Sequence, residues 1–65
     1  RYVIQVIERG TYLAVGADGQ SLVEVVEVAD AHLFHVHDAA VRAAVELNAE
    51  GRGPVDVLKV ELEIG

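Results

Sequence analysis

The hydrophobic residues of the chain fall into short runs typical of strands and one longer segment with a helical period. Residues 2–8 (YVIQVIE) and 11–15 (TYLAV) are rich in β-branched and aromatic residues, and a glycine-containing loop at 8–10 separates them. Two such runs predict a β-hairpin. In residues 11–15 neither set of alternating side chains is polar, which predicts a sheet covered on both sides, by a helix and by another subunit.

The next apolar run is compatible with two structures. Residues 22–28 (LVEVVEV) contain apolar positions at helical spacing and also an alternation of valine and glutamate. Because valine strongly favours extended backbone, we interpret the run as a strand. Residues 29–31 then predict a tight helical turn, and residues 32–34 a short extended piece that carries Phe34 inward.

The clearest element is a helix over residues 37–49. One side of the helix carries a narrow apolar stripe, formed by Ala40, Ala44 and Leu47 with Val41 beside it. The opposite side carries charges at spacings of four residues that predict ion pairs, Asp38, Arg42 and Glu46. Asn48, Gly51 and the Gly53-Pro54 pair are stop signals for this helix.

The last run, residues 58–64 (LKVELEI), alternates strictly between apolar and charged residues. This predicts a half-buried antiparallel strand with Leu58 and Val60 on its buried face. Val55 and Val57 have the opposite parity, so a bulge or strand start is expected near Val57. The whole chain, residues 1–65, therefore predicts one small α+β domain. We expect an antiparallel sheet of three to four strands with one α-helix packed across it, in the order β-β-β-α-β.

Composition narrows the possible partners. The chain has 65 residues, 52% of them hydrophobic, which is apolar for so small a domain and predicts that part of its surface meets another chain. The net charge of −6 argues against direct binding of nucleic acid or anionic membranes. The apolar runs are too short for a transmembrane helix. The absence of cysteine excludes disulfides and thiolate metal sites, and it slightly favours a reducing compartment.

All three histidines lie within residues 32–37, in the stretch AHLFHVHD. If this stretch is extended, His35 and His37 point the same way and are candidate zinc ligands, although a structural site needs four ligands. The alternative, which we favour, is an exposed entry to the helix, with Asp38 close to the positive end of the helix dipole. In either case the histidines could make an interface sensitive to pH.

Nothing in the sequence indicates catalysis or a cofactor. Ser21 and Thr11 are the hydroxyl residues besides the tyrosines, and neither stands in a nucleophile motif. The turn at 16–19 lacks the lysine of a phosphate-binding loop. The acidic residues suggest either a negative face that competes with nucleic acid for a basic protein or a means of staying soluble. The candidates for such a face are Glu24, Glu27, Asp30, Asp56, Glu61 and Glu63.

The order of these signals resembles a widespread type of small phage-encoded protein. The matching residues are Tyr2-Val3-Ile4, Tyr12-Leu13, Ala31-His32-Leu33-Phe34, Ala40 with Ala44, Leu47-Asn48, and Val57-Leu58-Lys59-Val60. In the resembling proteins polar residues, often acidic or serine, precede the helix, whereas this chain has His35-Val36-His37-Asp38. The resemblance brings no catalytic residues. It implies a location in the bacterial cytoplasm and an accessory role, since some small acidic phage proteins disarm host defences by binding their components.

These observations lead to one main hypothesis and two alternatives. We expect a non-enzymatic phage or mobile-element accessory protein that binds a host protein, as a homodimer joined through its sheet. The first alternative is a structural or regulatory subunit domain from a cellular operon. The second is a metal-binding protein that uses His35 and His37.

Overall fold

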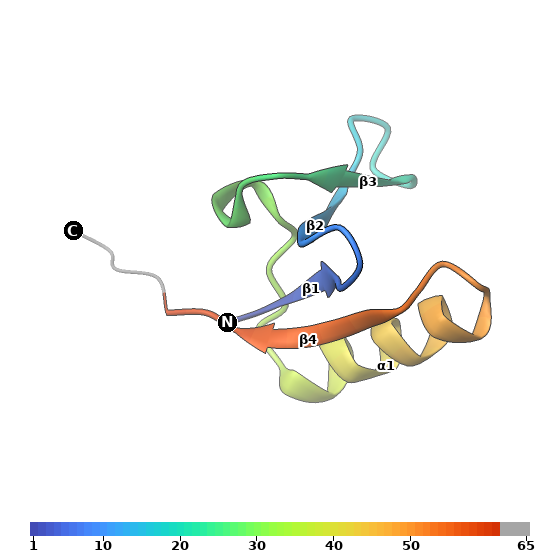
Figure 1. Cartoon of the computed structure of the whole chain (residues 1–65). Coiled ribbons are helices and arrows are strands. Elements are labelled where there is room, and N and C mark those ends of the chain that lie inside the picture. Colours follow the sequence, from blue (N-terminus) through green and yellow to red (C-terminus); the bar gives the residue numbers. More distant parts are fainter. Residues whose placement is uncertain (62–65) are drawn as a thin grey trace.

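The computed structural model describes residues 1–61 and shows a four-stranded antiparallel sheet with one α-helix packed against it (Figure 1). The elements are, in chain order, β1 (Tyr2–Val6), β2 (Thr11–Val15), β3 (Leu22–Val25), a 3₁₀ turn η1 (Val28–Asp30), α1 (His37–Ala49) and β4 (Val55–Lys59). The strand order in the sheet is β3-β2-β1-β4. The predicted α+β fold and element order are confirmed. Within residues 1–61, no helix has the length and hydrophobicity that a membrane span requires.

Helix α1 packs against β1 and β4, at one end of the sheet (Figure 1). Ala44 and Leu47 of the helix join Ile4, Val6 and Val55 of the two strands in one buried cluster. The predicted stripe of Ala40, Ala44 and Leu47 is confirmed as the buried side of the helix. Alanine at two of these positions lets the helix backbone lie close to the strands. The predicted ion pairs on the opposite side are not formed. The one ion pair within residues 1–61 joins Arg9 and Glu24.

The segment 32–34 lies between β1 and β2. These two strands pair directly only at Gln5–Tyr12 and Val6–Thr11. Beyond these pairs the backbone N–H of His32 donates to the Leu13 carbonyl at 3.0 Å, on the β2 side. On the β1 side, Phe34 and Tyr2 exchange two backbone hydrogen bonds of 2.8 and 2.9 Å. The extended piece predicted from the sequence therefore works as a wedge in the sheet, and Phe34 packs against the core.

Strand β4 differs from its prediction. It begins at Val55 and pairs with β1 without interruption from Val6–Val55 to Tyr2–Lys59, so the expected bulge near Val57 is wrong. Val55 and Val57 belong to the core cluster beneath α1, whereas Leu58 and Val60 have the other parity. The alternation of side chains could not identify the buried face, because apolar residues occupy both faces of this strand. Residues 62–64 of the predicted strand lie outside the described part of the chain.

Asn48 joins the end of α1 to the beginning of β4. Its Oδ1 accepts a hydrogen bond from the Val55 N–H at 3.0 Å, and its Nδ2 donates to the Val55 carbonyl at 3.3 Å. The loop between the two elements passes very close to this side chain. A Cβ atom on Gly53 would lie 1.9 Å from the Asn48 Oδ1, so any other residue there would displace the Asn48 carboxamide.

The turn between β2 and β3 is organised by Asp18. Its Oδ2 accepts a hydrogen bond from the Ser21 hydroxyl at 2.6 Å, and its Oδ1 accepts from the backbone N–H groups of Gln20 and Ser21, each at 2.9 Å. These bonds favour the ionised carboxylate, with the Ser21 hydroxyl contributing most, and lower the pKa of Asp18 to about 2.

The depressed pKa of Asp18 gives the turn a pH-dependent stability. The stabilisation is present above the usual aspartate pKa of about 3.9 and is lost as the pH falls through about 2. We expect an NMR titration of the Asp18 carboxyl to give a pKa near 2 and to give a higher one in Ser21→Ala. Thr11→Val removes a hydroxyl elsewhere and should leave the titration unchanged. An ordinary Asp18 pKa in the parent would contradict the turn geometry.

Replacing Asn48 tests the connection between α1 and β4. In Asn48→Ala the N–H and carbonyl of Val55 lose their partners, and we expect the free energy of unfolding to fall by about 1 kcal/mol. Amide exchange at Val55 should become faster. Glu46→Ala, an exposed change on the same helix, is the control for denaturant unfolding. An unchanged Val55 exchange rate in Asn48→Ala would show that this connection contributes nothing.

Candidate functional site

The sheet has two edges, β3 and β4, and they differ in their backbone chemistry. In an antiparallel pair, alternate residues direct their N–H and C=O toward the neighbouring strand and the others direct them outward. The hydrogen bonds from Ile7 to Pro54, 3.1 Å, and from Val60 to Arg1, 2.9 Å, fix this alternation for β4. It follows that Val55, Val57 and Lys59 direct their backbone groups to the outer side of β4.

Side chains occupy much of this outer side of β4. Asn48 bonds both backbone groups of Val55, and the Asp56 Oδ1 accepts from the Val57 N–H at 2.8 Å. Lys59 is exposed, and a lysine on an edge strand discourages pairing with another chain. Over Val55–Lys59, three of the outward backbone groups of edge β4 are therefore occupied, which opposes the addition of a strand.

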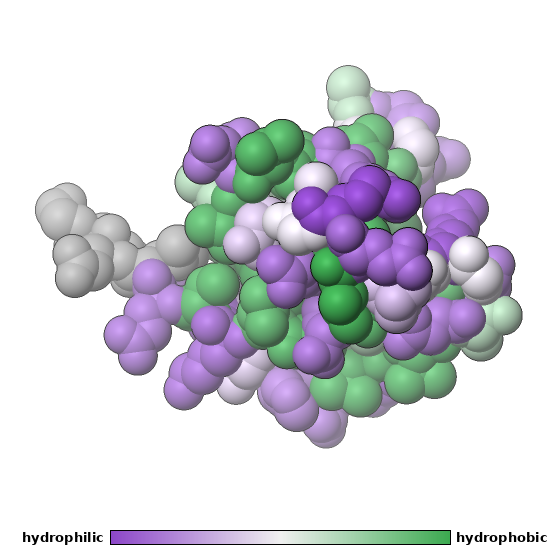
Figure 2. Space-filling model, in the orientation of Figure 1, coloured by the Kyte–Doolittle hydropathy of each residue, from purple (hydrophilic) through white to green (hydrophobic). Residues whose placement is uncertain are grey.

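Edge β3 is open. The hydrogen bond from the Gly16 N–H to the Ser21 carbonyl, 2.7 Å, fixes the alternation here, so Leu22 and Glu24 direct their backbone groups outward. In the described part of the chain no side chain caps these groups. The strand is also apolar and exposed, with Leu22 41%, Val23 42% and the following Val26 79% exposed. Figure 2 shows apolar surface in the region of β3, in the upper part of the view. Edge β3 is thus suited to pairing with another strand.

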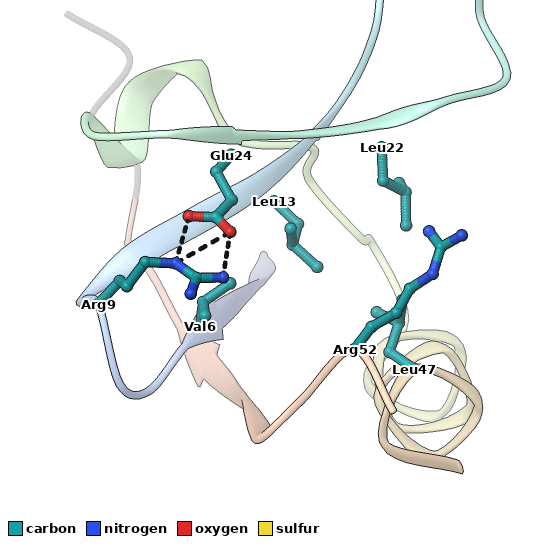
Figure 3. Close-up of a pocket in the computed structure, with 7 residues that line it drawn as sticks. All are labelled: Val6, Arg9, Leu13, Leu22, Glu24, Leu47 and Arg52. Carbon is teal, nitrogen blue, oxygen red and sulfur yellow. Dashed lines mark hydrogen bonds and ion pairs between the residues drawn. The ribbon is translucent and has the colours of Figure 1, made fainter. Parts of the chain in front are cut away.

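A cleft of about 250 Å³ lies beside β3, on the face of the sheet that carries α1. It exists because α1 covers β1 and β4 and leaves the β2–β3 part of the same face uncovered. Apolar side chains come from three strands and the helix, and charged side chains lie around them (Figure 3). The lining consists of Val6, Leu13, Leu22, Leu47, Arg9, Glu24 and Arg52.

The charged groups at the cleft are not equivalent. Arg9 and Glu24 form an ion pair in which the Arg9 Nε lies 3.1 and 2.9 Å from the two carboxylate oxygens, and the Thr11 hydroxyl donates to Glu24 at 2.9 Å. The hydrogen bond from Arg9, and then that from Thr11, lowers the pKa of Glu24, and the same pair raises the pKa of Arg9. Arg52 extends from the loop after α1 toward Leu22 (Figure 3) and makes no ion pair within residues 1–61.

The three histidines have different surroundings in the structure. The ring of His37 packs on Tyr2, with centroids 5.0 Å apart, and the ring of His32 meets Phe34 edge-on at 4.8 Å. His35 is exposed. No three or more His, Cys, Asp or Glu side chains among residues 1–61 are arranged to hold a metal ion. His37 is the first residue of α1, as the sequence predicts.

The acidic candidates are distributed over both edges of the sheet. Glu24 belongs to the cleft and is neutralised by Arg9. Glu27 and Asp30 are exposed and follow β3, whereas Glu61 follows β4, the strand at the opposite edge. Glu63 lies outside the described residues. The one negative face suggested by the sequence stays a prediction.

Sequence reasoning missed both arginines of the cleft. Arg9 and Arg52 stand in glycine-containing loops, which the sequence indicates only as turns. Two basic residues in turns of an acidic chain are the signal that could have drawn attention to them. Their proximity to one apolar cleft depends on the strand order and could not be derived from the sequence.

The contact between His37 and Tyr2 predicts a packing role for this histidine. In His37→Ala we expect the free energy of unfolding to fall by less than about 1 kcal/mol, equally with zinc and with EDTA. His35→Ala should be neutral, because this exposed side chain has no such contact. A zinc-dependent increase in melting temperature that either substitution abolishes would establish a metal site and contradict the packing role.

Comparisons with known proteins give no indication of function. Neither protein-family models, nor curated proteins, nor solved structures give a match to the chain. The surface to be explained is therefore defined by its chemistry, an open apolar strand edge beside a cleft with one arginine that lacks an acidic partner among residues 1–61.

Proposed function

We propose that the chain is a non-enzymatic accessory protein of a phage or mobile element that acts in the bacterial cytoplasm by binding other proteins, and that it forms a homodimer through β3. The observation that carries this proposal is the contrast between the two sheet edges. Edge β4 is occupied by Asn48 and Asp56, whereas edge β3 presents apolar residues and backbone groups that no side chain of residues 1–61 caps.

Pairing of β3 with the β3 of a second copy gives a symmetric arrangement. Two antiparallel copies of the same edge form an isologous interface, in which each copy contributes the same residues. The sheet then continues from one copy into the other, with both helices on the same face. The exposed Val23 and Val26 provide apolar surface that such an interface buries.

The remaining parts of the proposal have separate support. A non-enzymatic role agrees with the hydroxyl groups of Ser21 and Thr11, which both donate to carboxylates and are used in local structure. The phage origin and bacterial location rest on the sequence resemblance. The net charge of −6 favours a protein partner over nucleic acid.

Lysine substitutions on β3 test the dimer. We expect the parent to be a dimer at tens of micromolar by gel filtration with light scattering, and Val23→Lys with Val26→Lys to be a monomer, because charged edge residues oppose strand pairing. The control is Val45→Lys, which adds one lysine at a position 61% exposed on α1, away from β3, and should remain dimeric. A strictly monomeric parent would contradict the proposed dimer.

A further inference from the structure

The cleft beside β3 has a local charge opposite to that of the protein. The chain carries a net charge of −6, yet the cleft is lined by two arginines and one glutamate. The glutamate is already bonded by Arg9 and Thr11, so its charge is compensated within the protein. Arg52 is left as a cation next to apolar side chains, an arrangement that favours an anionic group attached to an apolar one.

We propose that this cleft binds an extended segment of a partner protein in which a carboxylate side chain stands next to a large apolar side chain. The apolar side chain enters between Leu13, Leu22 and Leu47, and the carboxylate pairs with Arg52. The inference rests on the proposed function only in taking the occupant to be a protein. Pairing of β3 uses the edge of the sheet, whereas the cleft lies on its face, so both can occur together.

The size of the cleft favours side chains of a protein over a cofactor. Its volume of about 250 Å³ is below the range of about 300–1,000 Å³ typical of sites that enclose a small molecule. One apolar side chain and one carboxylate fill such a space. The cleft is partly open to solvent, so side chains of another protein can reach it.

Arg52 is held at its base and extended at its end. Its backbone N–H donates to the Leu47 carbonyl at 2.9 Å, which fixes the loop at the end of α1. The guanidinium then reaches toward Leu22 across the cleft (Figure 3). A guanidinium binds a carboxylate through two parallel hydrogen bonds, and Arg52 is exposed and accessible to such a group. Arg52 is therefore the residue that selects an acidic partner.

Arg9 has a second, indirect role. By bonding Glu24 it removes the repulsion that this carboxylate would exert on an acidic occupant. Replacing Arg9 by glutamine leaves Glu24 uncompensated on the rim. The same acidic segment should then bind more weakly, although Arg52 is unchanged.

The experiment uses a blocked peptide, acetyl-Glu-Leu-Glu-Leu-Glu-amide, and follows the leucine and valine methyl signals of the full chain by NMR. We expect the methyl signals of Leu13, Leu22 and Leu47 to shift. Arg52→Gln should lower the affinity by up to about fivefold, the loss expected for an exposed ion pair. Arg42→Gln removes an exposed charge on α1 and should bind as the parent does. Arg9→Gln should bind more weakly than the parent.

Two further peptides separate charge from hydrophobicity. Replacing Glu by Gln, or Leu by Ser, should each reduce binding, because the cleft requires both groups. Equal affinity of the Gln peptide, equal affinity of Arg52→Gln, or no methyl shifts at millimolar peptide would overturn the proposal. Shifts confined to Val23 and Val26 would place the peptide on the β3 edge and would also overturn it.

The test separates this inference from the proposed dimer. If the methyl signals of Leu13 and Leu47 shift when the protein is diluted without peptide, the occupant of the cleft is a second copy, and the proposal of a different partner is wrong. Peptide binding to the cleft of a monomeric Val23→Lys, Val26→Lys variant would support the cleft independently of the dimer. A dimeric parent with a cleft that binds no peptide would leave the dimer in place and remove the present inference.

Discussion

The arrangement of the sheet depends on the backbone hydrogen bonds that the segment 32–34 makes on both of its sides. His32 bonds to Leu13 of β2, and Phe34 bonds to Tyr2 of β1. These bonds satisfy backbone groups that β1 and β2 would otherwise have to satisfy in each other, so the two strands can separate after two paired positions. The sheet thereby consists of a β1–β4 half, which α1 covers, and a β2–β3 half, which α1 leaves open. The cleft lies where the two halves meet.

Much of this architecture could be predicted from local sequence patterns. The helix bounds and the bounds of β2 agree with the prediction because the spacing of Ala40, Ala44 and Leu47 and the turn residues around β2 are local signals. The buried face of β4 could not be predicted, since valine and leucine occupy both parities of that strand. The cleft was beyond sequence reasoning for a different reason. Its residues come from separate segments, and only the order β3-β2-β1-β4 and the position of α1 bring Arg52 near Leu22.

The stretch AHLFHVHD shows how an apparently chemical motif can be structural. Two of its histidines have aromatic neighbours, Phe34 for His32 and Tyr2 for His37, and its backbone forms the wedge between β1 and β2. Asn48 is the converse case. The sequence indicates it only as a helix stop, whereas its carboxamide takes the place of a neighbouring strand at Val55.

The occupation of one sheet edge limits how far self-assembly can proceed. A sheet with two open edges can add copies at either end and grow into a fibril. Here Asn48, Asp56 and Lys59 oppose strand addition along Val55–Lys59, and β3 is the more open edge within residues 1–61. Once two copies have paired, neither has an unused edge of that kind. For a small protein with so much exposed valine, a few polar atoms at β4 thus favour a finite particle over open-ended polymerisation.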